Sequence, residues 1–129
     1  MVWGGRMTAT PSLWGGKELS LVCIPFTAFS ADGLHVLLDE VPTQAEFCVR
    51  AGNDVALLQG TTGEWPSLSL TERIDLATEW RRCIPVGHKM KLILHIGHDA
   101  LVDAMHLARV AAVRAKIHLY LSECRPWRR

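Results

Sequence analysis

The chain has 129 residues, of which 49% are hydrophobic, and its formal net charge is +1. This length allows one domain with a hydrophobic core and predicts no second one. The near-neutral charge argues against nucleic acid as a partner. No apolar run reaches the ~18 residues of a membrane span, and the opening segment lacks the apolar core of a secretory signal. We therefore expect a cytoplasmic protein that has neither a nucleic-acid nor a membrane partner.

Composition along the chain divides it into three parts. Residues 1–18, rich in Gly, Trp and Pro, are expected to be a poorly ordered leader, and residues 19–121 to form the domain. Residues 122–129, with Arg125, Arg128 and Arg129, form a basic tail. The four cysteines are spread without a CxxC pair, which is typical of reduced thiols.

The first predicted elements are a strand, a helix and a second strand. The apolar stretch Leu19–Phe26 predicts a strand, which a turn at residues 30–33 closes. A helix follows, and its regular part begins near Pro42, because proline lacks the N–H that a helix interior requires. Gly52 ends this helix as its C-terminal cap. The next strand is Asp54–Gln59.

A second helix is predicted over Leu70–Cys83. Ser69 and Glu72 have the S-x-x-E spacing of a capping box. Apolar side chains recur along one stripe of this helix, as expected if it packs on a sheet. The stripe consists of Leu76, Ala77, Trp80 and Ile84.

The remaining elements continue the alternation of strands and helices. Residues 91–96 predict a strand, Asp99 is a candidate N-cap of a third helix, and residues 116–121 predict a fourth strand. The third helix is expected to face inward with Leu101, Met105, Ala108 and Ala112. Such alternation requires parallel strands joined by right-handed crossovers, so the fold class is α/β.

The segment Gly60-Thr61-Thr62-Gly63 lies between the second strand and the second helix. Its two hydroxyls lie beside backbone N–H groups that the turn leaves unpaired, an arrangement that suits a small carboxylate or phosphate. In parallel α/β folds, such loops lie at the carboxyl ends of the strands, where ligands bind. An ordinary turn, whose threonines make only local hydrogen bonds, is the alternative.

Three motifs together carry a resemblance to a known family. They are GTTGEWPSLSLTER at residues 60–73, DLATEW at 75–80 and LILHIG at 92–97. The chain resembles the N-acetylneuraminate lyase and dihydrodipicolinate synthase family of class I aldolases over roughly residues 19–114, on the N-acetylneuraminate lyase side. Thr27-Ala28-Phe29 resembles the family's TPF motif with alanine in place of proline, whereas Ile24-Pro25-Phe26 is the alternative register.

The resemblance implies a fold, a chemistry and a set of binding residues. The fold is a (β/α)8 TIM barrel. Because a closed barrel takes ~250 residues, this chain is expected to be truncated, with the first three to four βα units. The family holds pyruvate as a Schiff base on a lysine, and no metal or other cofactor is implied. Thr61 and Thr62 match the pair that grips the carboxylate, and Gly63 lets the backbone approach it.

No catalytic residue of the family has a counterpart here. Lys89, Lys91 and Lys116 fall at amino ends of predicted strands, whereas barrel active sites lie at the carboxyl ends. Tyr120 lies inside the fourth strand and is a poor match for the family's proton-relaying tyrosine. The pair His95 and His98 lacks a third ligand, so we expect no metal site.

These observations give one functional hypothesis and one alternative. The first is an N-acetylneuraminate lyase-like fragment that retains the pyruvate-carboxylate loop and is inactive alone. The alternative is a non-catalytic module that binds 2-oxo acids or another subunit. An open parallel sheet also exposes an edge and an apolar face, which predicts self-association or a homo-oligomer.

Overall fold

The computed structural model describes residues 20–113 and 117–120. The expected leader, residues 1–18, and the expected tail, residues 122–129, lie outside the described residues. In chain order the elements are β1 Val22–Cys23, α1 Val41–Arg50, β2 Val55–Leu58, α2 Leu70–Cys83, β3 Lys91–His95, α3 Leu101–Val113 and β4 Ile117–Tyr120, with short 3-10 helices η1 Leu38–Glu40 and η2 Trp65–Ser67. The alternation that the sequence predicts is therefore confirmed.

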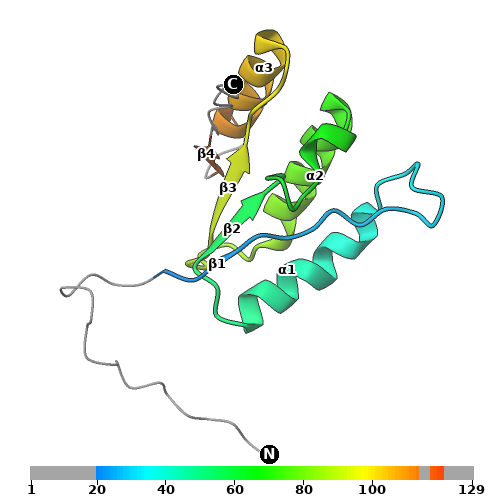
Figure 1. Cartoon of the computed structure of the whole chain (residues 1–129). Coiled ribbons are helices and arrows are strands. Elements are labelled where there is room, and N and C mark those ends of the chain that lie inside the picture. Colours follow the sequence, from blue (N-terminus) through cyan, green and yellow to red (C-terminus); the bar gives the residue numbers. More distant parts are fainter. Residues whose placement is uncertain (1–19, 114–116, 121–129) are drawn as a thin grey trace, which may run out of the picture.

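The four strands form one parallel sheet in the order β1-β2-β3-β4. Each strand pairs with its neighbour in the sequence, with Val22 opposite Val55 and Val55 opposite Lys91. This arrangement brings all carboxyl ends to one edge of the sheet, and the loops that follow β2 and β3 meet there (Figure 1).

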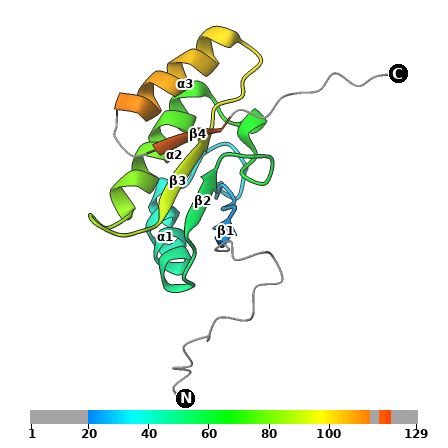
Figure 2. The same cartoon turned by 90° about the vertical axis from the view of Figure 1, so that its left-hand side faces the viewer.

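The three helices cover the same face of the sheet in both views (Figures 1 and 2). Alternate strand residues point into this layer, because successive side chains of a strand point to opposite faces. The buried strand side chains pack with Leu76 and Trp80 of α2 in one core. They are Ala56, Leu58, Leu92 and Leu94, each at most 2% exposed. Of the intervening residues, Val55, Leu57 and Ile93 are only half-buried on the face that the helices leave open.

Helix α1 begins and ends where the sequence predicts. Pro42 lies in its first turn, where a missing N–H costs no helical hydrogen bond. At the other end, Gly52 has φ 77° and donates its N–H to the carbonyl of Val49 at 3.1 Å. This is the left-handed C-terminal cap for which glycine is the preferred residue.

The first strand is shorter than predicted. The ladder with β2 covers only Val22–Cys23, whereas the apolar pattern runs over residues 19–26. The physical reason is that β1 lies at the sheet edge and has one neighbour only. Pro25 contributes by removing an N–H from the ladder.

Two expectations for α3 are wrong. The carbonyl of Ala100, rather than Asp99, accepts the first helical hydrogen bond, from the N–H of Ala104 at 3.2 Å. The buried face consists of Ala104, Leu107 and Ala111, whereas Leu101 is 75% exposed.

The rest of the expected inward face of α3 also differs, since Met105 is 46% exposed. Because α3 is apolar around most of its circumference, a period of 3.6 residues does not single out one stripe. No helix in the described part of the chain is long and apolar enough to span a bilayer.

Candidate functional site

The predicted binding residues directly follow β2 at the carboxyl edge of the sheet. Thr61 and Thr62 are exposed, and Gly63 is buried beneath them. A turn closes the loop, with the N–H of Glu64 donating to the carbonyl of Thr61 at 3.1 Å. Within the described residues, the hydroxyls of Thr61 and Thr62 make no hydrogen bond. Both are therefore available to an external acceptor or donor.

Gly63 is held from two sides. Its carbonyl accepts a 2.7 Å hydrogen bond from the buried hydroxyl of Thr27. On its other side, an added Cβ would lie 2.9 Å from the Cα of Gln59 and 3.0 Å from its N. Backbone atoms at that distance cannot move aside, so the fold requires glycine here.

Gln59 is buried and has a left-handed backbone, with φ 56°. Its side-chain amide makes a reciprocal pair with Arg73 of α2. The Nε2 of Gln59 donates to the carbonyl of Arg73 at 2.7 Å, and the Nε of Arg73 donates to the Oε1 of Gln59 at 3.0 Å. Because non-glycine residues rarely adopt this conformation, these two bonds help to hold Gln59 in it.

Arg73 connects the end of β2 to the end of β3. Its side chain is fully buried, and its guanidinium donates to the carbonyls of Gly97, at 2.7 Å, and His95. No carboxylate within the described residues forms an ion pair with it. Burial lowers the pKa of Arg73 to about 10, so the group stays positively charged at neutral pH.

Aromatic rings pack around this cation. The Trp65 ring centroid lies 5.4 Å from the Cζ of Arg73 and 5.4 Å from the His95 ring centroid. Burial, and then the nearby Arg73 cation, lower the pKa of His95 below its ordinary value. A neutral His95 therefore predominates at pH 7.

His95 and His98 flank Trp65 instead of sharing a ligand position. The His98 ring centroid lies 6.3 Å from that of Trp65, and its Nδ1 accepts from the N–H of Ala100 at 3.2 Å. Among the residues that the structure describes, no group of three His, Cys, Asp or Glu side chains could hold a metal ion.

Several of these residues were not predicted to belong to the site. From its position in the sequence, Arg73 resembles an ordinary charged residue on the surface of a helix. Gln59 resembles a polar residue at the end of a strand. Trp65 and Thr27 appear in the motifs without an assigned role. The missed signal is that two of them, Gln59 and Trp65, lie beside or in the GTTGEW loop. Glu64 shapes this loop through its backbone, at φ 54°.

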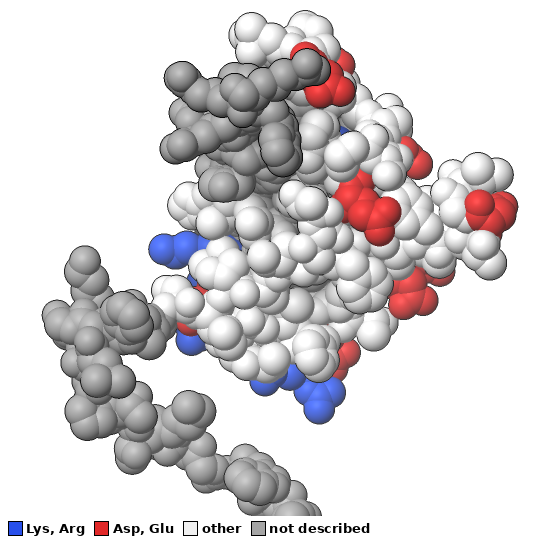
Figure 3. Space-filling model, viewed as in Figure 1, with Lys and Arg blue, Asp and Glu red and all other residues white. Residues whose placement is uncertain are grey.

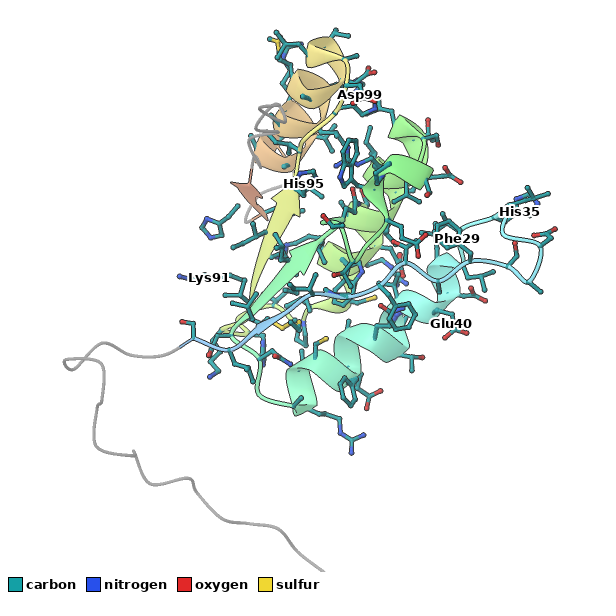
Figure 4. The ribbon with its side chains drawn as sticks, viewed as in Figure 1. Phe29, His35, Glu40, Lys91, His95 and Asp99 are labelled. Carbon is teal, nitrogen blue, oxygen red and sulfur yellow. The ribbon has the colours of Figure 1, made fainter. Side chains whose placement is uncertain are left out.

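The lysines within the described residues lie at the opposite edge of the sheet. Lys91 is the first residue of β3, and in Figure 4 it lies at the far end of that strand from His95. The Nζ of Lys89 forms a 2.9 Å ion pair with Asp54, just before β2. Lys17 and Lys116 lie outside the described residues. Tyr120 ends β4, in register with His95.

An apolar groove lies away from this loop. It has a volume of about 610 Å³ and runs between β1 and α1, where Ile24, Phe26 and Phe47 line it. Phe26 is 61% exposed and Phe47 is 71% exposed. In the view of Figure 3, charged side chains lie mainly around the periphery, and the centre of this face is largely uncharged.

Comparisons with known proteins agree with this geometry. Residues 19–115 match the model of the dihydrodipicolinate synthetase family. The chain is 34% identical over 104 residues to 4-hydroxy-tetrahydrodipicolinate synthase 2 of Streptomyces coelicolor, covering 81% of the chain and 33% of that protein. It is 36% identical over 97 residues to N-acetylneuraminate lyase of Gallus gallus, covering 74% of the chain and 31% of that protein.

A solved structure gives the same result. The Proteus mirabilis N-acetylneuraminate lyase superposes with a TM-score of 0.72 at 29% identity, covering 81% of this chain and 35% of that one. The chain thus spans about a third of the length of the relatives it matches. The described strands correspond to part of an aldolase barrel.

Proposed function

Since the chain belongs to the dihydrodipicolinate synthetase family, we propose that it is an N-acetylneuraminate lyase-like fragment that binds pyruvate and performs no aldol chemistry alone. The observation that carries this proposal is the position of Thr61 and Thr62. Their exposed hydroxyls lie at the carboxyl edge of a parallel sheet, on a loop that Thr27 and Gln59 hold in place. A 2-oxo acid carboxylate accepts hydrogen bonds from such groups.

The positions of the lysines support the inactivity of the chain. A Schiff base requires an uncharged amine within reach of the bound 2-oxo group. Lys89 and Lys91 lie at the amino edge, and Lys89 is held by Asp54. The open face of the sheet also leaves solvent access to the loop, and water favours the charged, unreactive ammonium form.

Pyruvate titration of the 129-residue chain, followed by amide NMR, tests the binding. Pyruvate is expected to shift the amides of residues 60–63. Replacing Thr62→Val removes a hydrogen bond to a charged group, which contributes about 1.5–3 kcal/mol, so affinity should fall at least about tenfold. Thr71→Val, an exposed substitution on α2, is the matched control. Absence of shifts in the loop amides at saturating pyruvate would refute the proposal.

Borohydride trapping tests the inactivity. The chain incubated with pyruvate and sodium borohydride should gain no mass, whereas a full-length N-acetylneuraminate lyase should be labelled under the same conditions. A covalent adduct on any lysine of this chain would show that it forms the Schiff base, and would contradict this part of the proposal.

The groove between β1 and α1 favours a second candidate, a subunit-interaction module of the same family. Its exposed phenylalanines leave apolar surface in contact with solvent, which a partner could bury. Sedimentation velocity with an equimolar full-length family member separates the candidates. A new, faster species would favour the module, and two independent boundaries would dismiss it.

A further inference from the structure

Arg73 has an arrangement that a helix surface charge does not need. It is 0% exposed, and its guanidinium and backbone carbonyl together make hydrogen bonds to Gln59, His95 and Gly97. These partners belong to two neighbouring segments, the end of β2 with the loop after it and the end of β3 with the loop after it. One buried side chain therefore bridges the two segments.

The geometry of the guanidinium matters because it is planar and forked. Nε, Nη1 and Nη2 each donate in a fixed direction, so the carbonyls of His95 and Gly97 and the amide of Gln59 are held in one plane. An ammonium group on a flexible stem could reach one of these acceptors at a time. The Trp65 ring, 5.4 Å from Cζ, covers the guanidinium with its face.

The charge of Arg73 is also unusual. Burial of a cation is costly unless acceptors or an anion compensate for it. Here the acceptors are neutral, so a positive charge remains in the interior at the edge where the Thr61–Gly63 loop lies. Such a fixed charge attracts a small anion more strongly than a surface charge does, since water and salt screen it less.

The chain of contacts from Arg73 to the binding loop is short. Gln59 is held by Arg73, and the backbone of Gln59 is the surface against which Gly63 packs, at the 2.9 Å and 3.0 Å distances of its hypothetical Cβ. Loss of the Arg73 fork would free Gln59 from its left-handed conformation. Gly63 and the two threonines before it would then lose their support.

We propose that Arg73 is a positioning residue for carboxylate binding: its fork locks the loops after β2 and β3 together and presents Thr61–Gly63 to the anion, while its uncompensated charge adds attraction. The inference rests on the proposed pyruvate binding at this loop. It assigns to a buried helix residue the role of setting affinity without touching the ligand.

Four variants of the 129-residue chain test this role. Arg73→Met removes charge and fork, and Arg73→Lys keeps the charge alone. Arg82→Met removes a 70% exposed charge from the same helix, and Leu76→Ala destabilises the core without touching the loops. Pyruvate affinity is measured by NMR titration at a temperature where each variant is fully folded, so that stability alone cannot change it.

Arg73→Met should weaken pyruvate binding at least tenfold, with Arg73→Lys between it and the unmodified chain. Arg82→Met and Leu76→Ala should stay within twofold. Unchanged affinity in Arg73→Met, or an equal loss in Leu76→Ala, would overturn the proposal. If Arg73→Met does not fold, Gln59→Asn replaces it, because asparagine tolerates positive φ and its shorter amide cannot reach Arg73.

Backbone ¹⁵N order parameters separate this inference from the proposed function. In Arg73→Met and Arg73→Lys, residues 61–63 and residues 97–99 should become mobile together, and in both controls neither should. If the unmodified chain fails to bind pyruvate, the proposed function is wrong, yet the joint loosening would still show that Arg73 couples the loops. Loosening of one loop alone, or of neither, would refute the coupling.

Discussion

Gly63 occupies a position where a single methyl group decides whether the loop forms. The backbone of Gln59 lies against it on one side, and Thr27 holds its carbonyl on the other. Its φ is not positive, so the requirement for glycine is one of space and not of backbone conformation. The loop thus tolerates change at its exposed threonines better than at this glycine.

We predict that Gly63→Ala lowers the free energy of unfolding by about 1–3 kcal/mol, because the added Cβ meets backbone atoms that cannot yield. Urea unfolding measures this change, and pyruvate titration should show that binding is lost. Gly60→Ala is the matched control, since the nearest atom to its Cβ would be the Leu57 Cδ2 at 4.0 Å. Equal stability of the two variants would contradict the close packing at Gly63.

The N-terminus of α2 is fixed by a complete capping box. The N–H and hydroxyl of Ser69 both donate to Glu72 Oε2, at 2.8 and 2.7 Å, and the N–H of Glu72 donates to the hydroxyl of Ser69 at 3.3 Å. This box begins the helix that carries Arg73 and immediately follows η2. The element that positions the site therefore has a defined start.

Ser69→Ala should lower the free energy of unfolding by about 0.5–2 kcal/mol at pH 7, because it removes the N-cap acceptor. The hydrogen bonds from Ser69 lower the pKa of Glu72 below its ordinary value of 4.5. The part of the box that the Glu72 carboxylate contributes is then fully present above about pH 4.5 and is lost as pH falls through the lowered pKa. Urea unfolding at pH 7 and pH 3 measures both effects, with Ser67→Ala as control. An effect of Ser69→Ala on the free energy of unfolding that is as large at pH 3 as at pH 7, or larger, would contradict the sign of this pH dependence.

Local sequence signals for individual helices and strands were sufficient to predict most of this fold. Pro42 and Gly52 mark the limits of α1, and the S-x-x-E spacing marks the start of α2, because each of these residues acts on the backbone beside it. The buried face of α3 was not predictable in the same way. Its apolar residues lie all around the helix, and only packing against neighbours selects Ala104, Leu107 and Ala111.

The position of the candidate site was predictable from the sequence, but the contacts that hold it were not. The loop at residues 60–63 could be assigned to a carboxyl edge from the alternation of elements. The contacts of Arg73 could not be predicted, since its partners Gln59, His95 and Gly97 are 14 to 24 residues away in the sequence. A buried arginine that pairs with no carboxylate among the described residues also contradicts the usual exposure of helix charges.

For the molecule as a whole, the described strands form an open sheet whose helices cover one face only (Figure 2). The chain spans about a third of the length of its relatives. Leu21, Val22 and Ile24 beside the sheet edge are 47–55% exposed, and Phe26 and Phe47 line the neighbouring groove. Exposed apolar surface of this kind favours association in water.

We predict that the 129-residue chain self-associates, with an average mass in sedimentation equilibrium that rises with concentration. Phe47→Glu places a charge in the groove and should shift this equilibrium toward the monomer by about tenfold or more in the association constant. Val86→Glu, at a side chain that is 94% exposed outside the groove, is the control. If both variants self-associate as strongly as the unmodified chain, the groove is not the self-association interface.

The contacts that Gly63 makes with Thr27 and Gln59 also bear on how the loop folds during synthesis. In the part of the chain that the structure describes, every group that holds the loop lies between Thr27 and Gly97. Polypeptides emerge from the ribosome amino end first, and early segments begin to fold while later ones are still being made. The proposed anion-binding loop can therefore take shape before any strand beyond β3 has joined the sheet.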